Sequence, residues 1–208
     1  MSYHTKSSSS LHTPLELNPL FITGFSDGEG SFSISVRDIN KDTKKARVLY
    51  VFSIILHKKD HGILRSIQST LGIGKIYNHG KEGVQYRVES KKEWLILIEH
   101  FDKYPLITKK SKDFLCFKKG ISLIKNKEHL TKEGLLKLVS LKALMGKGLT
   151  NELKAAFPDL IPANELGISN LTLSPDLIID PNLLAGFISN PSGIRKVVLS
   201  SVFLNLHL

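Results

Sequence analysis

The sequence predicts an α+β fold in which helices cover one face of an antiparallel sheet. Two observations support this prediction. Three segments between residues 31 and 90, at 31–37, 46–57 and 84–90, alternate apolar and polar residues, with the two-residue period of a half-buried strand. In the segments around them, apolar residues recur at the three- and four-residue spacing of amphipathic helices. The predicted order of elements over residues 18–125 is therefore α-β-β-α-β-β-α-α.

The first predicted helix begins near Asn18, whose side chain can cap it, and Pro19 suits its first turn. It ends at the cluster Asp27-Gly28-Glu29-Gly30. A strand follows at once, in which Phe32, Ile34 and Val36 point to one side of the sheet. The Asn40-Lys41-Asp42 region is predicted to turn the chain into the second strand.

The remaining elements are predicted along the rest of the chain. Strands are expected at 46–57, 74–79 and 84–90, and helices at 60–71, 91–103, 110–125, 135–145 and 151–157. The proline-containing stretch 158–182 is interpreted as a linker. We therefore divide the chain into a disordered tail (1–16), a half-domain (17–127), helical segments with a linker (128–182) and a short final segment (183–208).

Positive charge is concentrated in the middle of the chain, and this pattern favours a polyanionic partner. The formal net charge is +10, and residues 37–125 hold 20 Lys/Arg against 9 Asp/Glu. Clustered charge of this kind is typical of nucleic-acid binding, although a basic surface kept for solubility is the plainer alternative. The single cysteine, Cys116, excludes a disulfide framework, and no apolar run is long enough to predict a membrane span.

The stretch Leu20 to Phe32 is the strongest local motif. An apolar helix ends in two carboxylates, Asp27 and Glu29, which are separated by glycine and followed directly by a strand. Carboxylates at a helix C-terminus are disfavoured by the helix dipole, so they attract a cation. An acidic helix-to-strand turn without any ligand is the structural alternative. Gly24 leaves one face of this helix open to close approach by another backbone.

Residues Ile22 to Gly30 resemble, in register, the nine-residue motif of the LAGLIDADG homing endonucleases and the related intron maturases. The predicted elements that follow are similar to the α-β-β-α-β-β-α half-domain of that family. The segments 104–110, 113–114 and 133–135 resemble members encoded in fungal organellar introns. The resemblance covers about 18–188 and implies a mitochondrial protein, although no clear targeting peptide is visible.

The resemblance implies a catalytic mechanism and the residues that carry it. In the family, carboxylates at the ends of two packed motif helices hold Mg²⁺ for hydrolysis of DNA phosphodiester bonds at a long recognition site. By position in the motif, Glu29 is the expected catalytic metal ligand, and the Gly28 carbonyl is the expected supporting ligand. Asp27 matches the first acid of the motif, which caps or stabilises more often than it takes part in cleavage.

The family also implies that the polar face of the sheet binds the major groove of double-stranded DNA. Arginine there suits guanine and glutamine suits adenine. The candidate contact residues on the predicted strands are Ser31, Ser33, Ser35, Arg37, Arg47, Ser53, Lys75, Tyr77, His79, Gln85 and Arg87. Lys109 and Lys110 follow a Pro-Leu-Ile-Thr loop and are expected to reach a phosphate near the active centre.

A second copy of the motif helix is predicted at 182–188, but the acidic residues that should follow it are missing. Ser189 and Pro191 stand where Asp27 and Glu29 stand in the first copy, and the residues from 189 onward are too few for a second sheet. We therefore interpret 183–208 as the start of a truncated or frame-shifted second half. The predicted motif-helix interface consists of Ile22, Gly24, Phe25, Leu184, Gly186 and Phe187. A homodimer through Ile22–Phe25 could supply two copies of Glu29.

Three functions remain open from the sequence. The first is a Mg²⁺-dependent homing endonuclease impaired by the incomplete second half. The second is a maturase that binds intron RNA through the basic surface without cutting DNA. The third is a DNA-binding remnant without activity. Charge clustering fits all three, and Glu29 favours the first.

Overall fold

The structure is a computed structural model that describes residues 14–38, 46–158, 160 and 179–189. Its described strands form a four-stranded antiparallel sheet in the order β1-β2-β4-β3. The strands are β1 (Gly30–Arg37), β2 (Arg47–His57), β3 (Lys75–His79) and β4 (Gly83–Val88). The predicted α+β fold is confirmed, and so is the predicted order of elements, with one short 3₁₀ turn (Lys58–Asp60) added before the second helix.

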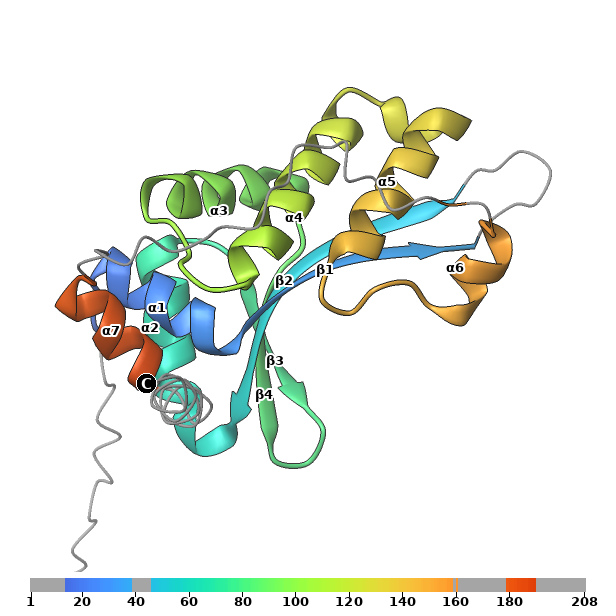
Figure 1. The fold of residues 1–208 in the computed structure, drawn as a ribbon. Helices are drawn as coiled ribbons and strands as arrows, with labels where there is room; N and C mark the ends of the chain where they lie inside the picture. Colours follow the sequence, from blue (N-terminus) through green and yellow to red (C-terminus); the bar gives the residue numbers. More distant parts are fainter. Residues whose placement is uncertain (1–13, 39–45, 159, 161–178, 190–208) are drawn as a thin grey trace, which may run out of the picture.

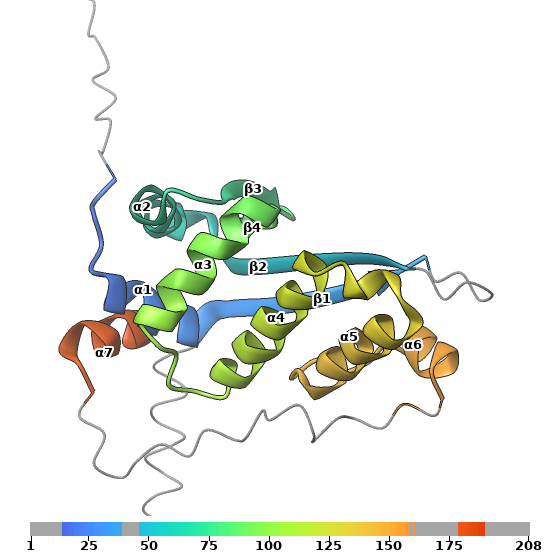
Figure 2. The ribbon, with the colours of Figure 1, turned by 90° about the horizontal axis from the view of Figure 1, so that it is seen from above.

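The helices lie close to the predicted ranges. They are α1 (Pro19–Glu29), α2 (His61–Leu71), α3 (Lys91–Lys103), α4 (Lys110–Lys125), α5 (Lys132–Leu144), α6 (Asn151–Ala156) and α7 (Pro181–Ile188), with a second 3₁₀ turn, η2, at Glu128–Leu130. Figures 1 and 2 show that α7 lies beside α1, although the two helices are far apart in the sequence. None of the described helices is long and apolar enough to cross a membrane.

The sheet is amphipathic, and its apolar face carries the core. Phe32, Ile34 and Val36 of β1 are buried, and their neighbours in the strand are not. The ring of Phe32 packs against Phe101 of α3 and Phe117 of α4, with ring centroids 5.6 and 5.4 Å apart. Helices α3 and α4 therefore cover this face (Figure 1), and the opposite face carries the polar side chains.

Strand register aligns the polar positions of different strands. Ser31 of β1 is paired with Ser53 of β2, which is paired with Arg87 of β4, and Arg87 is paired with Lys75 of β3. Because side chains alternate between faces, the partners in each such row share a face. The predicted turn at 40–42, most of the linker and the segment after Ser189 lie outside the described residues.

Candidate functional site

The acidic end of α1 leads directly into the sheet. Helix α1 ends at Glu29, β1 begins at Gly30, and the backbone N–H of Gly30 donates to the carbonyl of Ser26. Asn18 caps the other end, where its side chain accepts a hydrogen bond of 2.9 Å from the backbone N–H of Leu20. With no intervening loop, the half-buried Glu29 side chain is held at the junction between helix and sheet.

Asp27 is buried and fully engaged with the loop before α4. Its carboxylate accepts hydrogen bonds from the backbone N–H of Ile107 (2.8 Å), from the hydroxyl of Thr108 (2.7 Å) and from the backbone N–H of Thr108 (3.4 Å). Burial raises the pKa of Asp27, and these hydrogen bonds act in the opposite direction. These contacts tie the motif helix to a segment 80 residues away.

Lys110, the first residue of α4, reaches the same end of α1. Its ammonium donates to the Gly28 carbonyl at 2.7 Å and to the Ser26 carbonyl at 3.1 Å. A cation at this position complements the negative end of the helix dipole. The structure thus brings Lys110 to the predicted site, whereas Lys109 is exposed at the start of α4. The Gly28 carbonyl, predicted as a metal ligand, shares its lone pairs with a lysine here.

The predicted contact residues on the strands lie on one face of the sheet. Register and alternation align the positions Ser31, Ser33, Ser35, Arg37, Arg47, Ser53, Lys75, Tyr77, His79, Gln85 and Arg87, none of which is buried. We call this set the polar sheet face. It begins next to Glu29, because Ser31 follows Glu29 by two residues. Their role in binding DNA stays a prediction.

Sequence reasoning missed apolar members of this same face. Val51, paired with Ser33, is half-buried; Leu49, paired with Ser35, is 37% exposed, and Ile55, paired with Gln85, is 43% exposed. The alternation of β2 could have identified them, since they occupy the same phase as Arg47 and Ser53. Apolar side chains at such positions can contact the methyl group of thymine.

Arg87 is the most closely packed cation of the polar sheet face. Its guanidinium pairs with Glu89 at 2.7 Å and lies 5.9 Å from the ring centroid of Tyr77. Its Nε is buried and has no hydrogen-bond partner among the described residues. These contacts preorient Arg87 and Tyr77 on neighbouring strands.

Helices α1 and α7 cross through a pair of glycines. A Cβ added to Gly24 would clash with the backbone of Leu183, and a Cβ added to Gly186 would clash with the backbone of Phe21. Gly24 thus gives the close backbone approach that the sequence predicts.

The predicted interface residues differ in burial. Leu184 is 43% exposed, whereas the neighbouring Leu183 is buried, so a role for Leu184 in the interface stays a prediction. Positions 183 and 186 share a helical face that turns 184 outward. Ile22 is buried in the core cluster of the half-domain. Because α7 covers the Gly24 face of α1, a homodimer through Ile22–Phe25 would require α7 to move, and it stays a prediction.

Metal ligands are sparse in the described part of the chain. No group of three or more His, Cys, Asp or Glu side chains among the described residues could hold a metal ion. The oxygen donors at the end of α1 are the Glu29 carboxylate and nearby backbone carbonyls. The predicted failure of the second motif at Pro191 lies outside the described residues.

Comparison with known proteins places this geometry in a family. Residues 22–121 match the sequence profile of the LAGLIDADG endonuclease. A Neurospora crassa protein named "Probable intron-encoded endonuclease 3" is 38% identical over 187 residues, which are 88% of this chain and 34% of that protein. The chain therefore spans about a third of that relative's length.

Solved structures show the same architecture. The LAGLIDADG meganuclease I-CpaMI, bound to uncleaved DNA, is 48% identical with a TM-score of 0.74, over 83% of this chain and 58% of that one. The I-SmaMI homing endonuclease, bound to cleaved DNA, is 44% identical with a TM-score of 0.75, over 83% of this chain and 57% of that one. The described fold is thus shared with proteins crystallised on DNA.

Proposed function

The chain belongs to the LAGLIDADG family, and we propose that it binds duplex DNA along the polar sheet face and hydrolyses phosphodiester bonds at Glu29. The single observation that carries this proposal is the direct junction between α1 and β1. It sets the Glu29 carboxylate at the end of α1, two residues before the first position of the polar sheet face. A strand of DNA lying on that face would pass the carboxylate.

The Glu29 carboxylate and the Gly28 carbonyl could form one half of a Mg²⁺ site. Mg²⁺ prefers hard oxygen ligands and retains several water molecules, so one carboxylate with substrate phosphate oxygens is a common arrangement. Glu29 would hold the ion, and the Gly28 carbonyl could join it only by giving up part of its contact with Lys110. When bound, the ion would activate water and stabilise the leaving oxygen.

Lys110 and Asp27 support Glu29 in different ways. The Lys110 ammonium, 2.7 Å from the Gly28 carbonyl, is placed to offset negative charge that develops on a phosphate at this end of α1. Asp27 is a positioning residue, because it binds the backbone of Ile107 and Thr108 and thereby fixes the start of α4. It is too buried to reach substrate, with 1% of its surface exposed.

The test uses the full chain, a randomised duplex library and Mg²⁺. Glu29→Gln should abolish any strand cleavage and leave duplex affinity within about twofold, since one neutralised carboxylate removes no phosphate contact. Glu99→Gln, an exposed carboxylate on α3, is the matched control and should cleave as the unaltered chain does. Cleavage that persists in Glu29→Gln would contradict the assignment.

Salt dependence tests the binding half of the proposal. Duplex affinity should fall steeply as salt rises, because Lys/Arg–phosphate contacts release counterions. A salt-independent affinity would refute a nucleic-acid function. Binding to structured intron RNA without any duplex cleavage would instead support the maturase alternative. We expect the chain to act in mitochondria, as its resemblance to organellar intron proteins suggests.

A further inference from the structure

A polar groove lies between α2 and the edge strand β3. It has a volume of about 490 Å³. Its lining includes His61, Arg65 and Gln68 from α2 and Lys75 and Tyr77 from β3. The α2 residues fall on one helical face, because they are spaced four and three apart.

The described lining of the groove carries positive charge. Arg65 and Lys75 are both exposed, and no Asp or Glu is among the described residues that line it. Gln68 is fixed in place, since its side-chain amide donates to the Gly74 carbonyl at 2.8 Å. The groove is therefore a preformed, electropositive and largely polar concavity, which suits an anion.

The groove is continuous with the polar sheet face. Lys75 and Tyr77 line the groove and also belong to that face, where Lys75 is paired with Arg87. Strand β3 is at the edge of the described sheet, so its outer backbone groups make no ladder hydrogen bonds within the sheet. Backbone N–H groups and basic side chains are the usual partners of DNA phosphates.

We propose that this groove binds the phosphate backbone of DNA as it leaves the polar sheet face, with Arg65 as the main contact. The proposal rests on the proposed function, because it extends the same DNA around the β3 edge. It adds α2, on the helix side of the sheet, to a binding surface for which the sequence indicated only strand residues, Lys109 and Lys110. The competing explanation is that the positive charge at the β3 edge only prevents this strand from pairing with a strand of another molecule.

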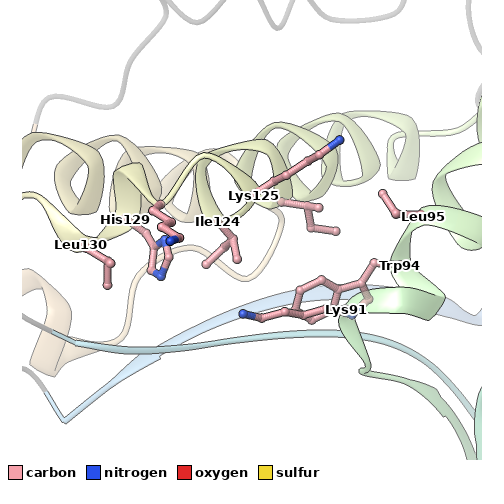
Figure 3. A pocket seen from close by; sticks show the side chains of 9 residues that line it. Lys91, Trp94, Leu95, Ile124, Lys125, His129 and Leu130 are labelled. Atoms are coloured by element: carbon pink, nitrogen blue, oxygen red, sulfur yellow. The ribbon is translucent and has the colours of Figure 1, made fainter.

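A second cavity provides a contrast and a control. It has a volume of about 450 Å³ and lies between the start of α3 and the end of α4. Figure 3 shows Trp94, Ile124 and Leu130 around it, and Lys91 of α3 and Lys125 of α4 also line it. Its lining is mostly apolar, and none of its described lining residues belongs to the polar sheet face. Lys125 is therefore a cation that DNA on the polar sheet face should not touch.

The experiment compares Arg65→Ala with Lys125→Ala in the full chain, with mixed-sequence duplex DNA. Both changes remove one positive charge from an exposed helical position, and alanine preserves the helix. For Arg65→Ala we expect the slope of log affinity against log salt to become shallower by about 0.9, the value for one lost phosphate contact. For Lys125→Ala the slope should stay as in the unaltered chain.

Equal slopes for the two variants would overturn the proposal and leave the proposed function standing, provided that the unaltered chain still binds DNA. A chain that does not bind duplex DNA at all would overturn both. Size-exclusion chromatography of Arg65→Ala tests the competing explanation, since self-association with an unchanged slope would assign Arg65 to edge protection. Hydroxyl-radical footprinting gives a second measure. Arg65→Ala should lose protection only at the outer end of the footprint, and uniform loss would also count against the groove.

Discussion

Helices α1 and α7 begin with the same local arrangement, a polar N-cap side chain followed by proline. Asn18 accepts a hydrogen bond from the backbone of Leu20, and Asp180 accepts one from the backbone of Asn182, at 2.9 and 2.8 Å. At the crossing, a glycine of each helix lies against the backbone of the other helix. The helix start and the crossing therefore depend only on local sequence and on small residues.

The two helices differ in the faces turned away from the crossing. Ile22 of α1 is 1% exposed, whereas Leu184, the equivalent residue of α7, is 43% exposed. Asp27 is buried and hydrogen-bonded, whereas the equivalent Ser189 is exposed. Both motif helices therefore make the glycine crossing. Only α1 has its acidic end held by hydrogen bonds from the half-domain.

The largest expected effect separates Asp27 from Ser189. Asp27→Ala should lower the free energy of unfolding by about 3 kcal/mol, because the backbone donors of Ile107 and Thr108 lose their acceptor in a buried site. Ser189→Ala should change it by less than about 0.5 kcal/mol. Urea unfolding followed by circular dichroism at pH 7 measures both. Similar losses in the two variants would mean that the two helix ends are held alike.

Acid should loosen the attachment of α1 through His100. Its Nε2 lies 3.3 Å from the hydroxyl of Thr23, and burial lowers the pKa of His100 from 6.5 to about 4. Between these two values the unfolded chain binds a proton that the folded chain does not. The free energy of unfolding should therefore decrease as pH falls through this window, by up to about 3 kcal/mol.

His100→Gln should remove that part of the pH dependence, as measured by urea unfolding at pH 7, 5.5 and 4. His79→Gln, at an exposed strand position, controls for the loss of a histidine. If the two variants keep the same acid sensitivity as the unaltered chain, His100 does not couple α1 to proton binding.

The smallest expected effect concerns the crossing itself. Gly24→Val should lower the free energy of unfolding by about 2 kcal/mol and release α7, because the added side chain meets the backbone of Leu183. Limited proteolysis should then cut near 179–189 faster than in the unaltered chain. Gly62→Ala is the matched control, since a Cβ there meets open space. Unchanged protection of 179–189 in Gly24→Val would show that the crossing tolerates bulk.

The sequence by itself determined the elements and the two faces of the sheet. Alternation in β1 and β2 predicted which side chains are buried, because a two-residue period is a local property of extended backbone. The caps Asn18 and Asp180 begin their helices for equally local reasons. The placement of Glu29 at a helix-to-strand junction was likewise readable, since both elements meet there without a loop.

Only the tertiary structure decided what holds the acidic end of α1. The partners of Asp27 and of the Gly28 carbonyl are residues 107–110, and no local period indicates a contact across 80 residues. The groove between α2 and β3 could not be predicted either. In the sequence Arg65 is an ordinary exposed helical residue, and only the fold places it next to β3. Hydrogen bonds and charge act over a few ångströms of space, so their partners are fixed by packing and not by distance along the chain.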